Sequence, residues 1–132
     1  MFIAFYTLVN GEWQGAFKNT FREDDLGPYY SVASMSGNTA MVGFWNAYDY
    51  AGTVLVFEQD NLGGWKKVDD PFVRDINATV GYFGWHVDID RELACVTDKY
   101  NAHLIRREVI KWIQFDKIQM VMMVCAPFQE IG

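Results

Sequence analysis

A short aromatic segment, residues 44–50, carries the side chains best suited to contact a ligand. Aromatic rings offer flat apolar faces on which a sugar or a peptide can stack, and the amide and carboxylate groups between them can supply hydrogen bonds. The corresponding later segment, residues 99–101, keeps a single ring. The candidate ligand-binding residues are Trp45, Asn46, Tyr48, Asp49, Tyr50 and Tyr100. The alternative is that these rings are interior packing between neighbouring units of the fold.

The residues that could carry catalysis or bind a transition metal are not spaced for either role. His86 and His103 are the only histidines, and neither has metal-ligand spacing to a cysteine or to the other. Cys95 lies in an apolar run, which predicts a buried free thiol, and Cys125 is far from it in the chain. A Cys–His nucleophile would need His86 beside Cys95 and a third, orienting group. We therefore expect a protein that is not an enzyme and that needs no cofactor.

The composition predicts one packed domain over residues 1–132. Of the 132 residues, 51% are hydrophobic and 17% aromatic, which is enough to build a core. The net charge of −6 argues against nucleic acid as a partner, because such binding needs clustered Lys and Arg. Residues 1–9 are apolar but lack a basic leader, sufficient length and a cleavage site. We therefore expect neither a signal peptide nor a membrane span there.

Short apolar runs bounded by Gly, Asn and Asp predict antiparallel strands along most of the chain. The strands of one four-stranded antiparallel meander, in chain order, are expected at residues 29–35, 38–43, 52–58 and 64–68. No helix is expected within 29–68, and residues 83–89 should start the next sheet. Val54, Val56 and Phe83 should be buried.

Two of these runs recur, which indicates an internal repeat. Phe57 and Trp65 follow Tyr6 and Trp13 by 51 and 52 residues. A second set recurs at a constant shift of 54 residues: Gly27, Met35, Ala40 and Val42 correspond to Gly81, Ile89, Ala94 and Val96. One extra residue near Ala33, absorbed by a β-bulge, would align the two copies differently. The sequence leaves both the ungapped and the bulged alignment open. A period just above 50 lies near the length of β-propeller blades, about 40–50 residues.

Four runs of the sequence together resemble the FG-GAP repeat. They are residues 36–43 (SGNTAMVG), 51–60 (AGTVLVFEQD), 63–65 (GGW) and 82–89 (YFGWHVDI). FG-GAP repeats build β-propellers, including the one at the head of integrin α chains. In the family Phe-Gly opens the innermost strand of a blade, which Phe83-Gly84 matches, whereas Tyr29-Tyr30 stands in its place one blade earlier. The family's Gly-Ala-Pro is replaced by Gly43-Phe44-Trp45 and Thr97-Asp98-Lys99. The resemblance covers about residues 3–102.

The resemblance implies an all-β fold of antiparallel four-stranded propeller blades. About two blades and part of a third are expected, with residues 1–18 as outer strands of a preceding blade, 27–68 as a full blade and 81–125 as a degenerate one. Residues 19–28 would be a polar connection. Two or three blades cannot close a ring, since propellers have about four to eight, so we expect a truncated chain.

The end of the last blade allows two interpretations. The repeat favours a third strand over residues 109–113 and a fourth over 119–125. Ile105, Val109 and Trp112, however, share one face of a helix, and no Gly or Pro in 103–126 marks a turn. We favour strands.

The resemblance also implies a function. It predicts a non-catalytic binding or adhesion module with a protein or carbohydrate ligand, in an extracellular or cell-surface setting. Asn77-Ala78-Thr79 is a glycosylation sequon that fits this setting. The alternatives are a fragment of a propeller hydrolase or lyase, and a structural repeat protein completed by oligomerisation. An unclosed stack leaves strand edges and an apolar blade face open, so self-association is expected.

Calcium is not expected. Integrin-type blades bind calcium in an Asp-rich loop, and Asp88, Asp90 and Glu92 alternate at the matching place. The stretch to Val96 is too short for such a loop, and alternating residues of a strand share one face, here towards solvent.

Overall fold

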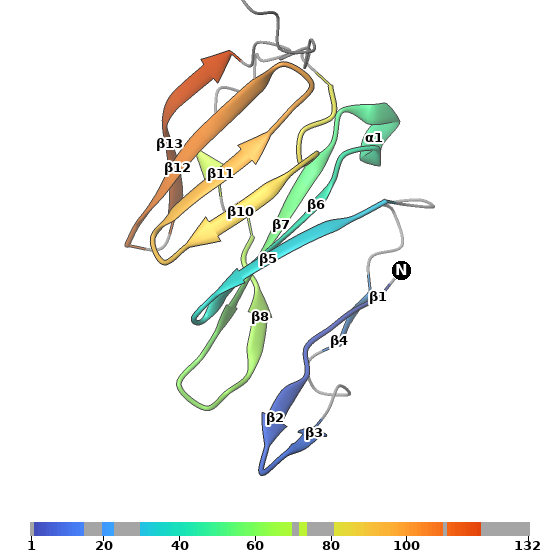
Figure 1. The fold of residues 1–132 in the computed structure, drawn as a ribbon, viewed down its shortest axis with the longest axis vertical. Helices are drawn as coiled ribbons and strands as arrows, with labels where there is room; N and C mark the ends of the chain where they lie inside the picture. Colours follow the sequence, from blue (N-terminus) through green and yellow to red (C-terminus); the bar gives the residue numbers. More distant parts are fainter. Residues whose placement is uncertain are drawn as a thin grey trace, which may run out of the picture.

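The computed structural model describes residues 2–14, 20–22, 30–69, 72–73, 81–109 and 111–119, and most of its regular structure is β-strand (Figure 1). The strands form a central four-stranded sheet, a five-stranded sheet and two two-stranded ladders near the N-terminus. In Figure 1 the N-terminal strands lie at the lower right, the central sheet in the middle and the five-stranded sheet at the upper left. The chain is therefore a β-protein with mainly antiparallel sheets.

The central sheet is the predicted meander. Its strands pair antiparallel in chain order: β5 (Val32–Ser36), β6 (Thr39–Phe44), β7 (Thr53–Gln59) and β8 (Trp65–Lys67). Gly37 has a φ of 55° in the turn from β5 to β6, a conformation that costs glycine little. Asp60 closes the turn from β7 to β8, where its Oδ1 accepts hydrogen bonds from two turn amides at 2.9 Å. Val54 and Val56 are buried, as predicted.

The expectation that residues 29–68 contain no helix is wrong for a single turn, α1 (Ala47–Tyr50). The backbone at Tyr48 and Asp49 is left-handed, with φ of 52° and 54°, so α1 is not a continuous right-handed helix. The amide of Gly52 donates a hydrogen bond to the carbonyl of Ala47 at 2.9 Å and closes the loop. Because the turn lies in the connection from β6 to β7, the strand order is unchanged.

The five-stranded sheet contains a second antiparallel meander. Its members, in spatial order, are β10 (Val87–Asp90), β11 (Leu93–Thr97), β12 (Asn101–Glu108), β13 (Lys111–Gln119) and β9 (Phe72–Val73). The first strand begins at Val87 rather than at Phe83, because residues 81–86 run beside the central sheet instead, with an isolated parallel bridge from Phe83 to Gly52. Phe83 is buried, as predicted. The parallel pairing of β9 with β13 was not predicted.

The helical alternative for the C-terminal region is wrong, and so are the strand boundaries expected there. β12 ends at Glu108 and pairs with β13, which starts at Lys111, so the expected strand 109–113 spans a turn. Val109 turns the chain with a φ of 55°, a conformation that is rare for a β-branched residue. The sequence has no Gly or Asn at Val109 that would have predicted the turn. Residues 120–125 lie outside the described part. The β5–β6 ladder is regular through Ala33, and the register shift lies in β12–β13 instead.

The N-terminal strands form the first layer of the molecule. They are β1 (Phe2–Ala4), β2 (Thr7–Val9), β3 (Glu12–Gln14) and β4 (Thr20–Arg22). Asn10 and Gly11 join β2 to β3 with φ of 51° and 81°, as in a type I′ hairpin turn. The expectation of a polar connection over residues 19–28 is wrong at β4. Phe21 in β4 pairs with Ile3 in β1, and its ring centroid lies 4.7 Å from that of Phe57 in the central sheet. These contacts make the segment a strand.

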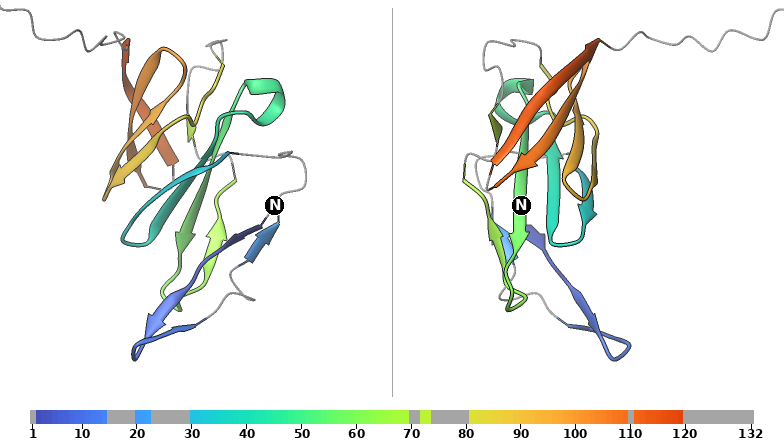
Figure 2. Two further views of the ribbon diagram at one scale, coloured as in Figure 1. Left: turned by 45° about the vertical axis from the view of Figure 1, so that its right-hand side comes forward. Right: turned by 90° about the vertical axis from the view of Figure 1, so that its left-hand side faces the viewer.

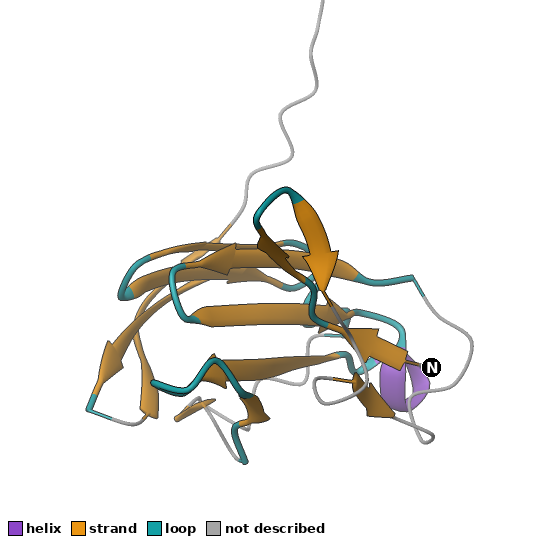
Figure 3. Cartoon of the chain, turned by 90° about the horizontal axis from the view of Figure 1, so that it is seen from below, coloured by secondary structure: helices purple, strands orange, loops and turns teal. Residues whose placement is uncertain are grey.

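The three layers enclose two hydrophobic cores, one on each face of the central sheet. The first core, towards the five-stranded sheet, contains Met41, Val54, Val56, Phe83, Ile89, Ala94, Val96, Ile105 and Trp112. The second core, towards the N-terminal strands, contains Ala40, Val42, Phe44, Ala47, Phe57 and Trp65, with Ile3, Phe5, Phe21 and Leu55 packed against it. Every residue of β6 is buried, because alternate side chains enter opposite cores. Figures 2 and 3 show the sheets stacked in succession.

The ladder register reproduces the internal repeat. Met35 pairs with Ala40 in β5–β6, and Ile89 pairs with Ala94 in β10–β11, so a constant shift of 54 residues relates the two hairpins. The outer hairpins resemble one another as well, because each has a tryptophan as the first or second residue of its last strand. Trp13, Trp65 and Trp112 lie opposite Leu8, Gln59 and Arg107. Their exposed fractions differ, at 70%, 8% and 0%.

Candidate functional site: an aromatic pocket where the two large sheets meet

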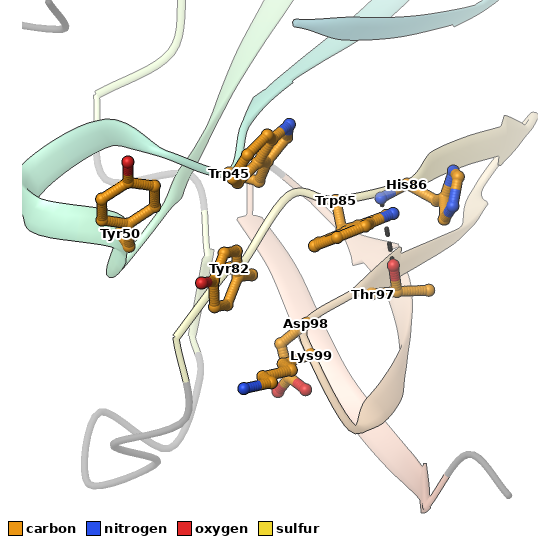
Figure 4. Close-up of a pocket in the computed structure, with 8 residues that line it drawn as sticks. All are labelled: Trp45, Tyr50, Tyr82, Trp85, His86, Thr97, Asp98 and Lys99. Carbon is orange, nitrogen blue, oxygen red and sulfur yellow. Dashed lines mark hydrogen bonds between the residues drawn. The ribbon is translucent and has the colours of Figure 1, made fainter. Parts of the chain in front are cut away.

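A pocket of about 600 Å³ opens where the loop after β6 meets the segment before β10 (Figure 4). Its lining residues are Trp45, Tyr50, Tyr82, Trp85, His86, Thr97, Asp98 and Lys99. They come from three separate segments, residues 45–50, 82–86 and 97–99, the last of which begins with the final residue of β11. The pocket therefore exists only when both large sheets are folded and packed together.

Backbone hydrogen bonds fix the middle segment between the other two. The amide of Tyr82 donates to the carbonyl of Tyr50 at 2.7 Å, and the amide of Gly84 donates to the carbonyl of Thr97 at 2.9 Å. Gly52, at φ 80°, lies so close that a Cβ would overlap the carbonyl of Phe83. The close approach requires glycine at this position.

Trp45 lies at the centre of the aromatic lining. Its ring centroid is 5.2 Å from that of Trp85, 5.4 Å from Tyr82 and 6.0 Å from Tyr50. Tyr30 stacks on it from outside the pocket, at 5.9 Å and an interplanar angle of 12°. Trp45 is half-buried, whereas Trp85 is 41% exposed. Trp45 thus combines the two roles considered from sequence, since it packs between sheets and also lines the pocket.

Polar groups occupy one side of the pocket. Thr97 Oγ1 accepts a hydrogen bond from the amide of His86 at 3.0 Å. The Lys99 ammonium lies over two rings, 5.6 Å from the centroid of Tyr82 and 5.3 Å from that of Tyr100, in cation–π geometry. In Figure 4 the Lys99 and Asp98 side chains lie below the rings of Tyr82 and Trp85. These groups offer a ligand a few directional contacts beside the apolar faces.

A buried acid–base pair supports this polar side. Asp98 Oδ2 lies 2.7 Å from His103 Nε2, and Asp98 Oδ1 accepts hydrogen bonds from the amides of Tyr100 and Asn101 at 2.7 Å. Burial acts to raise the pKa of Asp98, but the hydrogen bonds from His103, Tyr100 and Asn101 outweigh it and leave the pKa below its usual value. His103 Nδ1 lies 3.0 Å from Gln114 Oε1. Both ring nitrogens of His103 therefore have protein partners.

Cys95 is a free and partly buried thiol. Burial raises its pKa, and the charge of Asp88 adds to the shift. The thiol is therefore protonated at neutral pH, which makes it a poor nucleophile.

The structure brings together part of the predicted binding set. Trp45 and Tyr50 line the pocket, and Tyr100 adjoins it through Lys99. Asn46, Tyr48 and Asp49 are not among the lining residues, and Tyr48 is 61% exposed because the left-handed turn directs it away. The predicted glycosylation site, Asn77, lies outside the described residues.

Sequence reasoning missed most of the lining. The missed residues are Tyr82, Trp85, His86, Thr97, Asp98 and Lys99. The only signal in the sequence was the density of rings in the run YFGWH at 82–86, which matches that of the 44–50 loop. The interpretation of this run as the start of a strand concealed its role in the lining.

Two classes of site are absent from the described part of the chain. No group of three or more His, Cys, Asp or Glu among those residues is placed to hold a metal ion. Within the same residues, no helix has the length and hydropathy to cross a membrane.

Comparison of the chain with protein-family models, with curated proteins and with solved structures finds no match.

Proposed function

We propose that the chain is a non-catalytic binding module and that its aromatic pocket binds a carbohydrate. The observation that carries the proposal is the convergence of Trp45, Tyr50, Tyr82 and Trp85 on one pocket from separate connections. A volume of about 600 Å³ lies within the range of small-ligand sites, about 300–1,000 Å³. Pyranose rings present flat C–H faces that stack on aromatic side chains, with hydroxyl groups at their rims.

The polar side of the pocket supports the same ligand class. Lys99, Thr97 and His86 place a cation, a hydroxyl group and an imidazole beside the aromatic faces, and sugar hydroxyls can both donate to and accept from such groups. Binding without catalysis is favoured because both nitrogens of His103 have partners and the Cys95 thiol is protonated. No activated nucleophile is therefore found among these groups.

The fold part of the proposal treats the two large sheets as FG-GAP-type propeller blades. It is supported by two successive antiparallel meanders and by the repeated register of their first hairpins. An extracellular or cell-surface setting follows from this part of the proposal.

Titration with soluble oligosaccharides tests the ligand assignment. Neutral cello-, xylo-, manno- and chito-oligosaccharides would be screened by intrinsic fluorescence, because Trp45 and Trp85 report from the pocket itself. We expect one series to shift the emission saturably. Trp85→Ala should weaken that binding about 5- to 150-fold, since loss of an aromatic contact typically costs about 1–3 kcal/mol.

Tyr48→Ala is the matched control. It removes a ring from the 45–50 loop, which contributes to the pocket, but this ring is 61% exposed and does not line the pocket, so affinity should be unchanged. Equal loss in both variants would contradict the pocket as the site, and no saturable response to any series would contradict a carbohydrate ligand.

A further inference from the structure

The open faces at the two ends of the sheet stack are equivalent to faces that are buried inside it. The shared tryptophan position aligns Leu8, Gln59 and Arg107. Two residues before these three, on the same face, lie the equivalent residues Tyr6, Phe57 and Ile105. One residue earlier, on the opposite face, lie Phe5, Val56 and Leu104.

Both interfaces inside the molecule use these positions in the same way. At the first interface, Phe5 stacks on Trp65 with centroids 4.2 Å apart and packs against Phe57 at 5.3 Å. At the second, Val56 shares the first core with Ile105 and Trp112. In both interfaces, therefore, one side chain of a layer (Phe5 or Val56) packs against an apolar residue and a tryptophan of the next layer.

The last layer presents the same kind of face with nothing described against it. Leu104, Ala102 and Cys95 form this tail face, and they correspond to Val56, Val54 and Met41 of the central sheet. All three are partly exposed, whereas their counterparts are at most 4% exposed. None of the three belongs to either core of the described residues.

The first layer presents the complementary face. Tyr6, Leu8 and Trp13 form this head face, with exposed fractions of 59%, 55% and 70%. The counterparts of Tyr6 and Trp13 in the central sheet, Phe57 and Trp65, are 0% and 8% exposed because the N-terminal strands cover them. Three large exposed hydrophobic side chains, two on the β2–β3 hairpin and one directly before it, mark an interaction surface.

We propose that two copies of this chain associate head to tail, with the tail face of one copy on the head face of the next. Leu104 of one copy then lies against Tyr6 and Trp13 of the other, which repeats the contact of Phe5 with Phe57 and Trp65. A second copy is the occupant that the structure favours, because the molecule already stacks these two kinds of face on each other twice. The contact is heterologous, so further copies can add at both ends.

The head face is built on a short hairpin, so the interface is small and association is weak and concentration-dependent. Light scattering and sedimentation of the full chain, from low to high micromolar concentration, should show a mass that rises beyond the dimer. Trp13→Glu blocks the head face and Leu104→Glu the tail face, and each variant alone should remain monomeric. An equimolar mixture should form a heterodimer and nothing larger, because one intact head meets one intact tail.

Leu62→Glu is the matched control, since Leu62 is 96% exposed and lies outside both faces. It should associate as the parent chain does. Circular dichroism checks that each variant is folded, and Ala102→Glu replaces Leu104→Glu if the latter is not. As an independent readout, alkylation of Cys95, followed by peptide mass spectrometry, should slow as association proceeds.

Two results would overturn the proposal. One is a parent chain that stays monomeric at every concentration, with Cys95 equally reactive throughout. The other is association that persists in both folded glutamate variants or is not restored by mixing them, which would place the contact on other surfaces.

Discussion

At the scale of single residues, Trp45 is the side chain on which the pocket depends. Four rings surround it, so its removal should affect both the packing of these rings and the proposed ligand binding. The sequence alone singled out Trp45 as a candidate in an aromatic loop, and the structure places it in the pocket lining. It did not identify Tyr82 and Trp85 as neighbours, because their proximity arises only when the two sheets pack against each other.

We expect Trp45→Ala to lower the free energy of unfolding by about 2–3 kcal/mol, which is below the roughly 3–5 kcal/mol of a fully buried aromatic residue because Trp45 is only half-buried. Tyr48→Ala, on the same loop, should change it by less than about 0.5 kcal/mol. Urea unfolding of the two variants beside the parent measures both. Equal stability of the two variants would show that the rings around Trp45 contribute little to packing.

The second residue-scale prediction concerns Asp98. Its pKa in the folded state is lower than in the unfolded chain, so ionised Asp98 stabilises the fold above its unfolded pKa, and this contribution is lost as the pH falls through the folded value. Asp98→Asn should therefore be less stable than the parent near neutral pH. The difference should shrink as the pH falls below the usual pKa of 3.8. Denaturant unfolding across an acidic pH series measures it, and a difference that grows on acidification would contradict the assignment.

At the scale of the elements, turn chemistry explains what could be predicted. Asn10-Gly11, Gly37 and Asp60 mark reversals by their residue types, so the N-terminal hairpin and the central meander follow from local sequence. Val109 turns the chain without such a signal, and β4, which pairs with β1, lies within residues that look like a polar connection. The turn at Val109 and the strand β4 both depend on tertiary packing, which cannot be predicted from local residue propensities.

Gly52 supplies the prediction at this scale. Gly52→Ala would place a Cβ against the backbone of Phe83, whereas Gly11→Ala, with nearly the same φ, has nothing within 4 Å. Both variants carry the cost of a left-handed non-glycine residue, about 1–2 kcal/mol. Only Gly52→Ala adds a backbone clash, so it should unfold at a lower denaturant concentration than Gly11→Ala and should disturb the pocket's tryptophan fluorescence. Identical midpoints would mean that the segment at Phe83 shifts freely.

At the scale of the whole molecule, the layers depend on each other unequally. The two large sheets share the first core, whereas the N-terminal strands attach mainly through Phe5 and Phe21. Phe5→Ala should therefore release those strands before the rest unfolds and should reduce stability by about 2 kcal/mol. Phe2→Ala is the control, because that ring is 66% exposed on the opposite face. Limited proteolysis should cut within residues 2–14 faster in the first variant only, and equal cleavage in both would contradict this attachment.

The complete burial of β6 has a consequence for amide hydrogen exchange. A strand with sheets on both sides and paired strands at both edges has no route to solvent except through opening of the whole stack. Its amides should exchange last and at the rate of global unfolding, whereas those of β2 exchange through local fraying. Deuterium uptake should thus be fastest in the outer layers and slowest in β6 among the strands that the structure describes.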